Sequence, residues 1–257
     1  MHVALYRPLD PSTGIISKKI VDDITDFMVG ALASLNDLHN TLTFNKIWKQ
    51  RLVGVGALSY RDCLDLGLTG VMARSTGIKR DLRMDEVDTY ANYYHLSFRT
   101  YLGQKGDCYD RFLIRMNEIA ESLFIIGQLL SGLNNKNGKD IAADTLDMAS
   151  QLCPPHLLEN SKKNEYSSME GLVSHFKAWS EGSPIEPGWT YRAVEAPKGE
   201  LGVTLIANGS NKPHRCKVRS PALHSLQALP RLAKGHSLAD LSTLVGTVDI
   251  VFGEIDR

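Results

Sequence analysis

The stretch that decides the fold is "GDCYDRFLIRMNEIAESLFIIGQLLS", residues 106–131. Asp107 is a favourable N-cap residue, and apolar side chains follow it at the spacing of one helix face. These side chains are Tyr109, Phe112, Leu113, Met116, Ala120, Leu123, Gly127 and Leu130. The charged side chains are expected mainly elsewhere on the surface: Asp110, Arg115, Glu118 and Glu121. The pattern predicts a long amphipathic helix from Asp107 to about Ser131.

Apolar periodicity predicts further helices on both sides of this one. The segments are 17–42, with Ser17 as its cap, then 44–53, 59–66, 168–179 and about 237–245. The segment between two of these, "GVMARSTGIKRDLR" at 70–83, is punctuated by Gly, Ser and Thr. It is expected to be an ordered loop rather than a helix or strand.

The period changes towards the end of the chain. "TYRAVE", "ELGVTLIANG" and "HRCKVRS" predict three short strands joined as a meander, and "NGSNKP" supplies the second turn. The predicted fold class is mainly α with a small antiparallel β-meander. A single domain over 1–257 is expected, with a polar, variable surface insertion at about 132–164.

The totals exclude several classes of protein. Lys plus Arg equals Asp plus Glu at 29 each, so the formal net charge is zero and no nucleic-acid partner is expected. The four cysteines are widely spaced, which favours reduced thiols over a disulfide framework. Apolar runs fall short of the ~20 residues that a membrane helix needs. No signal or transit peptide is visible, so a membrane connection is expected only through partners.

Motifs for nucleotide and metal binding are also missing from the sequence. There is no P-loop and no G-x-G-x-x-G after a strand. Cys153 and His156 could be two zinc ligands, but without a second pair a structural role is favoured. The Asn208-Gly209-Ser210 sequon is better explained as a hairpin turn.

The segment "EAPKGELG", 195–202, is open to two interpretations. A plain hairpin turn would carry a surface ion pair between Glu195 and Lys198, worth at most ~1 kcal/mol. A functional site would instead bury both charges and bring the backbone close to another element at Gly199 and Gly202. The turn alone favours the plain hairpin.

Taken together, eight segments in order resemble one family, the quinone-site (49 kDa) subunit of respiratory complex I, also called NADH dehydrogenase subunit 7. They are "MHVALYRP", "NKIWKQR", "TGVMARSTGIKRDLR", "GDCYDRFLIRMNEI", "SSMEGLVSHFK", "EAPKGELGV", "RCKVRSPALHSLQAL" and "KGHSLADLSTLVGTVDIVFGEIDR". The family is related to the nickel–iron hydrogenase large subunits, so the resemblance implies that fold. The chain resembles only the C-terminal half, or somewhat more, of the family's subunit. Either the subunit is split into two polypeptides or the sequence is truncated; a split is the favoured expectation, with a separate chain carrying the N-terminal half.

The resemblance implies a peripheral-arm subunit of NADH:ubiquinone oxidoreductase, inactive alone, on the matrix side of the mitochondrial inner membrane. Other peripheral-arm subunits, one of them bearing a terminal [4Fe–4S] cluster, and membrane-arm subunits would be its partners, and ubiquinone the substrate. Hydrogenase relatives hold nickel and iron with cysteine pairs. The closing segment "DIVFGEIDR" has no cysteine, so no metal is expected there. A structural subunit without catalytic residues is the alternative.

Individual residues match functional positions of that family. His2 matches a His that donates a hydrogen bond to the partner's cluster, and Arg7 an Arg nearby. Four others match positions at the deep end of the quinone cavity: Asp249, Val251, Glu254 and Arg257. Asp249 and Glu254 are the candidates for proton handling. Three residues depart from the family pattern near the site: Leu9, Asp10 and Arg80.

Overall fold

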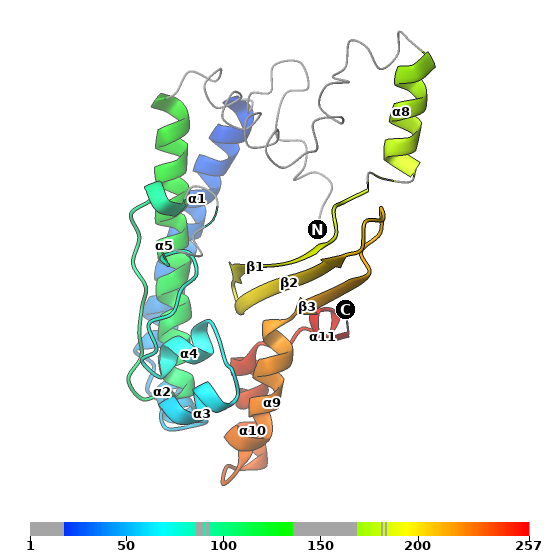
Figure 1. Cartoon of the computed structure of the whole chain (residues 1–257). Helices are drawn as coiled ribbons and strands as arrows, with labels where there is room; N and C mark the ends of the chain where they lie inside the picture. Colours follow the sequence, from blue (N-terminus) through cyan, green and yellow to red (C-terminus); the bar gives the residue numbers. More distant parts are fainter. Residues whose placement is uncertain are drawn as a thin grey trace. The chain divides into compact units, whose positions relative to one another are not determined.

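The computed structural model describes residues 18–85, 90, 93–135, 169–180, 182 and 184–256 (Figure 1). Its elements are α1 (Lys18–Leu38), the π-helical turn η2 (His39–Thr43), α2 (Lys46–Leu52), α3 (Tyr60–Asp65), α4 (Val71–Ser75), the 3-10 turn η3 (Tyr93–His95), α5 (Cys108–Asn135), α8 (Met169–Ser180), β1 (Gly188–Ala196), β2 (Gly199–Ala207), β3 (Arg215–Arg219), α9 (Pro221–Ala233), α10 (Leu238–Val248) and α11 (Phe252–Asp256). The described part is therefore mainly helical with one small sheet, as predicted.

The chain divides into two compact units. The larger comprises Met28–Gly127, Tyr191–Thr204 and Lys217–Arg257, and the other residues form the smaller unit. The single domain over 1–257 stays a prediction. Most of the insertion predicted at 132–164 lies outside the described residues, but 132–135 continue α5.

Helix α5 begins where the sequence predicts. The Asp107 carboxylate accepts hydrogen bonds from the backbone N–H of Asp110 at 2.8 Å and of Gly54 at 3.0 Å. The prediction that Arg115 and Glu118 lie mainly on the surface is wrong, because both are partly buried. Their polar ends have partners inside the protein, and this offsets the cost of removing them from water.

The core of the larger unit gathers residues from helices that are far apart in the sequence. Helix α10 packs against α9 and α2, and α3 packs against α4. The core side chains come from these helices, from α5 and from the loops between them: Leu52, Leu58, Cys63, Leu68, Met72, Ala73, Cys108, Ala228, Leu232, Leu244 and Val248. Burial of this cluster brings the C-terminal helices into contact with the first half of the unit.

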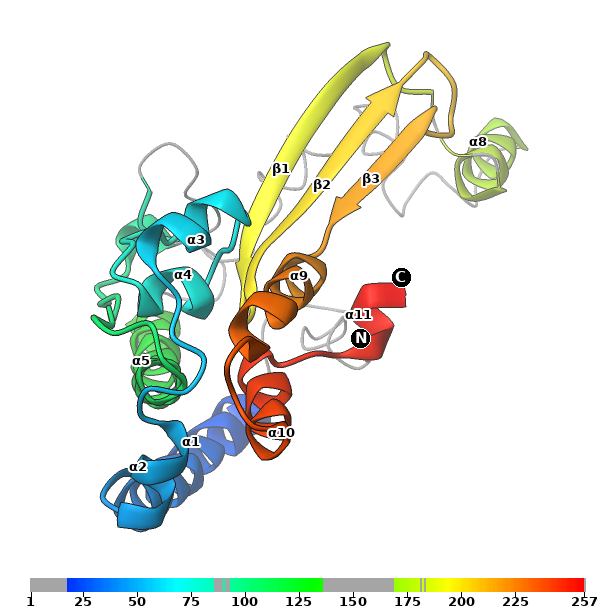
Figure 2. The same ribbon diagram turned by 90° about the horizontal axis from the view of Figure 1, so that it is seen from below.

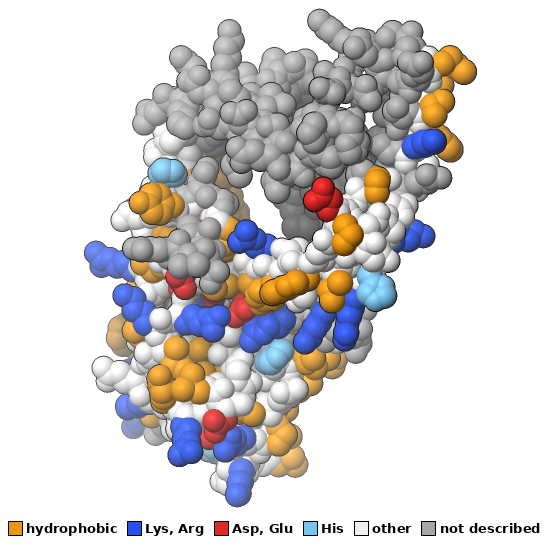
Figure 3. Space-filling view, viewed as in Figure 1, with side chains coloured by type: hydrophobic (Ala, Val, Ile, Leu, Met, Phe, Trp, Pro, Cys, Tyr) orange, Lys and Arg blue, Asp and Glu red, His pale blue; other side chains and the backbone are white. Residues whose placement is uncertain are grey.

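The three strands form one sheet in the order β1-β2-β3, which confirms the predicted meander (Figure 2). The third strand alternates basic side chains with others, and Figure 3 shows Lys and Arg side chains gathered over it. Among the described helices, none combines the length and the apolar character that a membrane crossing requires.

The structure corrects the prediction that all of 70–83 is loop. Residues 71–75 form the short helix α4 and are all buried. Gly70, with a φ of +67°, lets the chain turn sharply into this helix. Helices α9 and α11 were not predicted, whereas α10 was, and the Ser237–Asp240 capping box starts it.

Candidate functional site

The C-terminal segment, residues 249–256, leaves α10 through an unusual backbone conformation at Asp249. Asp249 has a φ of +57°, and no other non-glycine residue in the described part of the chain has a positive φ. Asp tolerates this left-handed conformation better than most residues, so it can end the helix where a glycine is more usual. The turn directs the chain through Val251, 48% exposed, into α11.

Glu254, in α11, satisfies the start of α9. One oxygen of its carboxylate accepts a hydrogen bond from the Ser220 hydroxyl at 2.9 Å and another from the backbone N–H of Ala222 at 3.1 Å. Pro221 has no N–H to offer, so Ala222 is the first free donor of that helix. The negative charge at this helix N-terminus is favourable, and it fixes α11 beside α9.

Lys198 joins the two carboxylates of the C-terminal segment. Its Nζ lies 3.6 Å from Glu254 Oε2 and 3.9 Å from Asp249 Oδ2. The Nζ atom is buried, and no acceptor among the described residues lies within hydrogen-bonding distance of it. Two of the residues predicted from the family resemblance, Asp249 and Glu254, therefore meet at one cation from a distant hairpin.

The hairpin that carries Lys198 is held close to the start of α4. A Cβ atom placed on Gly199 would lie 2.6 Å from the Thr69 hydroxyl oxygen, and one on Gly70 would lie 2.5 Å from Gly199 Cα. The Thr69 hydroxyl also accepts a hydrogen bond from the backbone N–H of Glu200 at 3.1 Å. The close backbone approach that the functional interpretation required is thus present at Gly199.

Glu195, at the other end of "EAPKGELG", pairs with Arg74 rather than with Lys198. The Arg74 guanidinium donates to Glu195 at 2.8 Å and to Glu118 at 2.9 Å, and its side chain is 2% exposed. Burial raises the pKa of Glu118 and outweighs the opposing charge of Arg74. The plain hairpin with a surface ion pair is therefore wrong, because both charges of the motif are largely buried.

Arg80, one of the departures from the family pattern, also has a partner. Its guanidinium lies 3.0 Å from Glu200 Oε2, and the other carboxylate oxygen, Oε1, accepts a hydrogen bond from the Tyr191 hydroxyl at 2.6 Å. Burial and this carboxylate raise the pKa of Tyr191 to about 12.

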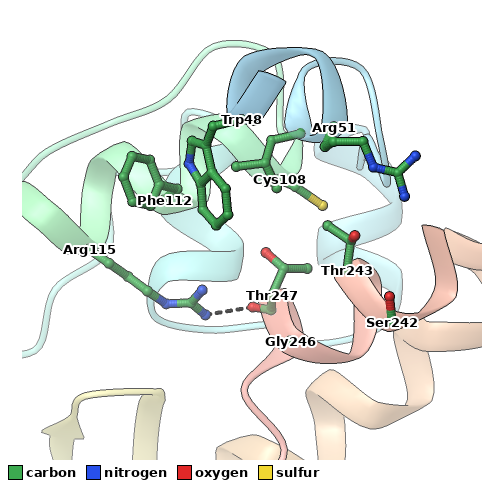
Figure 4. Close-up of a pocket in the computed structure, with 10 residues that line it drawn as sticks. Trp48, Arg51, Cys108, Phe112, Arg115, Ser242, Thr243, Gly246 and Thr247 are labelled. Atoms are coloured by element: carbon green, nitrogen blue, oxygen red, sulfur yellow. Dashed lines mark hydrogen bonds between the residues drawn. The ribbon is translucent and has the colours of Figure 1, made fainter. Parts of the chain in front are cut away.

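A cavity of about 460 Å³ lies next to the start of the C-terminal segment, between α2, α5 and α10 (Figure 4). Its lining combines aromatic and apolar side chains with hydroxyl groups and two arginines: Trp48, Arg51, Leu52, Cys108, Phe112, Arg115, Ser242, Thr243, Gly246 and Thr247. Its volume is within the range of small-molecule pockets. Asp249, Val251 and Glu254 do not line it.

Arg115 connects the cavity to the C-terminal segment. It donates a hydrogen bond to the backbone carbonyl of Thr247 at 2.6 Å, the dashed line in Figure 4. Burial lowers the pKa of Arg115, and the negative charge of Asp249 opposes this shift. Asp249 therefore interacts electrostatically with two cations, Lys198 and Arg115.

Comparison with known proteins decides the family. The profile of the family described as "Respiratory-chain NADH dehydrogenase, 49 Kd subunit" matches residues 14–257, nearly the whole chain. The chain belongs to the 49 kDa subunit family. This confirms the resemblance found in the sequence.

Individual members of the 49 kDa subunit family are similar over the full chain. The NADH-ubiquinone oxidoreductase 49 kDa subunit of Paramecium tetraurelia is 60% identical over 100% of this chain and 64% of its own length. A bacterial NADH-quinone oxidoreductase subunit, from Ehrlichia ruminantium, is 43% identical over 100% of this chain and 61% of its own length. The 49 kDa subunit of Cafeteria roenbergensis is also 43% identical, over 100% of this chain and 61% of its own length. The chain thus spans about three fifths of the length of these relatives.

Several residues assigned from the 49 kDa subunit family resemblance lie outside the described part of the chain: His2, Arg7, Leu9, Asp10 and Arg257. The possible zinc ligands Cys153 and His156 lie outside it too. Within the described part, no three His, Cys, Asp or Glu side chains gather where they could hold a metal ion. Sequence reasoning missed the roles of Arg74, Glu118 and Arg115. The last two share one side of α5 with the buried Arg111, at i+4 and i+7, and that spacing was the available signal.

Proposed function

We propose that this chain is part of a NADH:ubiquinone oxidoreductase, as a peripheral-arm subunit that forms part of the quinone-reduction site. Family membership over residues 14–257 is the observation that carries the proposal. In this function the complex transfers electrons from NADH to quinone and couples the transfer to proton pumping, and the chain is inactive alone. The part of the family's fold that it contributes is the hydrogenase-large-subunit-like one, as a single domain.

The described C-terminal segment supports this function through its chemistry. Reduction of a quinone to a quinol takes two electrons and two protons, so the site needs groups that hold protons beside an apolar surface for the ring. Asp249 and Glu254 supply carboxylates, with side chains 52% and 25% exposed. Val251, between them in sequence, supplies a half-exposed apolar side chain. In this proposal Arg257 also belongs to the deep end of the quinone cavity.

His2 and Arg7 would face a [4Fe–4S] cluster held by a partner subunit. An imidazole N–H donated to a cluster sulfide raises the reduction potential and makes it depend on pH. His2→Met in the assembled complex should lower the cluster potential and flatten its pH dependence. An unchanged potential in a redox titration followed by electron paramagnetic resonance would exclude this role.

The partners follow from the same proposal. They are the other peripheral-arm subunits, including the one that bears the cluster, and the membrane-arm subunits. The location is the mitochondrial inner membrane, on the matrix side, and nucleic acid is not among the partners. The eukaryotic 49 kDa relatives support the mitochondrial assignment.

Replacement of Val251 tests the quinone site in the assembled complex. Val251→Phe should raise the KM for a short-chain ubiquinone several-fold, because the larger side chain reduces the space available to the quinone ring. Val29→Phe, on an exposed face of α1, is the matched control and should leave KM unchanged. NADH oxidation by an artificial acceptor that takes electrons upstream of the quinone should be unaffected in both. A wild-type KM in Val251→Phe would favour the alternative, a structural subunit without catalytic residues.

A further inference from the structure

The proposed function leaves Lys198 of "EAPKGELG" without a role, although its position is closely determined. It occupies the turn between β1 and β2, next to Gly199, where the backbone has no room for a Cβ atom beside Thr69. The hydrogen bond from Glu200 N–H to the Thr69 hydroxyl holds the same turn. The hairpin therefore presents the Lys198 side chain to the C-terminal segment in a fixed position.

The ammonium group of Lys198 lacks a hydrogen-bond acceptor within the described part of the chain. Its Nζ is buried, yet the nearest carboxylate oxygens, of Glu254 and Asp249, are 3.6 and 3.9 Å away. Hydrogen bonds from N–H to oxygen are about 2.7–3.2 Å long, so these contacts attract the charge without satisfying its three donors. A buried ammonium whose donors find no acceptor among the described residues is costly, so an acceptor from a bound molecule would stabilise it.

The charges around Lys198 restrict the kind of acceptor. Two carboxylates, Asp249 and Glu254, lie beside the one ammonium of Lys198, so negative charge is already in excess next to it. Glu254 is also fixed by Ser220 and the start of α9 and is not free to move to Lys198. The two carboxylates would repel an anionic ligand, whereas a neutral oxygen acceptor would not be repelled. The half-exposed Val251 lies in the same segment and offers an apolar contact to the body of such a ligand.

We infer that Lys198 is a substrate-binding residue of the proposed quinone site, and that its ammonium donates a hydrogen bond to a neutral carbonyl oxygen of the quinone ring. The inference rests on the proposed function. The hydrogen bond orients the ring carbonyl between the hairpin and the C-terminal segment. The carboxylates of Asp249 and Glu254 attract the ammonium, and the ligand's oxygen would satisfy one of its donors.

The test compares substitutions in the assembled complex, with a short-chain ubiquinone as the probe. Lys198→Met should raise the KM, and the dissociation constant measured by equilibrium binding, by roughly tenfold to a hundredfold, the effect of one charge-assisted hydrogen bond. Lys198→Arg keeps the charge and donors in a different geometry and should restore part of the affinity. Lys234→Met, which removes an exposed lysine, should have wild-type constants.

The outcomes separate this inference from the proposed function. Wild-type constants in Lys198→Met, together with a raised KM in Val251→Phe, would overturn the role of Lys198 and leave the quinone site standing. Wild-type constants in both variants would overturn both proposals. If Lys198→Met does not assemble, Lys198→Arg decides: a raised dissociation constant supports the inference, and a wild-type constant overturns it.

Discussion

The burial of Arg74 allows the loss of unfolding free energy on its replacement to be predicted. Its guanidinium joins three elements of the larger unit, because it pairs with Glu118 of α5 and Glu195 of β1 from its place in α4. The side chains of Arg74 and Glu195 are 2% and 5% exposed. Arg74→Met would leave two carboxylates largely buried without their cation. Removal of one partner from a buried ion pair costs about 3–5 kcal/mol.

Arg80 provides a matched control within the same segment. It too pairs with a glutamate, at 3.0 Å from Glu200, but its side chain is 56% exposed. An exposed ion pair contributes at most about 1 kcal/mol, so Arg80→Met should have a small effect. The two substitutions remove the same groups and differ mainly in burial.

Thermal unfolding followed by circular dichroism measures both variants. For a protein of this size each kcal/mol lowers Tm by about 2–4 °C, so Arg74→Met should lower it by about 6–20 °C. Arg80→Met should lower it by no more than about 4 °C. If the two variants lose the same small amount, burial does not strengthen the Arg74 network and the reasoning is refuted.

Three further predictions concern local features of the fold. Gly199→Ala should cost about 1–3 kcal/mol in unfolding free energy, because the φ of Gly199 is +138° and a Cβ atom there would clash with Thr69. Gly30→Ala, at a position with open space around it, should be neutral or stabilising. Equal effects of the two substitutions in chemical denaturation would contradict this prediction. Tyr191 should ionise near pH 12, so the stability from its hydrogen bond to Glu200 is fully present below about pH 10 and is lost as pH rises through 12. An ultraviolet difference titration of the protein against Tyr191→Phe measures this ionisation. A midpoint at about pH 10 would be inconsistent with the prediction. Ser237→Ala should cost about 1 kcal/mol in denaturant unfolding through loss of the capping box, and an unchanged midpoint would speak against it.

The elements that could be predicted from the sequence are those whose signals are local. Asp107 and Ser237 are N-cap residues followed by periodic apolar side chains, and both helices begin there. The β-meander was predicted from short apolar segments separated by turn residues. Helix α4 was missed because its five residues are too few to show a period, and its burial depends on packing from distant segments.

The candidate site could be predicted only in part for a similar reason. Family resemblance pointed to Asp249 and Glu254, and the structure places both near Lys198. The partner of Glu195 could not be found from the sequence, because Arg74 is 121 residues away from it. Pairing across such a distance is a property of the tertiary fold, and a turn motif taken alone favours the nearest opposite charge instead.

The most direct test of the central claim is mass spectrometry of the complex purified through a tag on this chain. We expect iron–sulfur subunits of a NADH-oxidising complex, together with the rest of the 49 kDa family sequence and NADH-dependent ubiquinone reduction in the same fraction. Recovery of the chain without iron–sulfur subunits and without quinone reduction would contradict it.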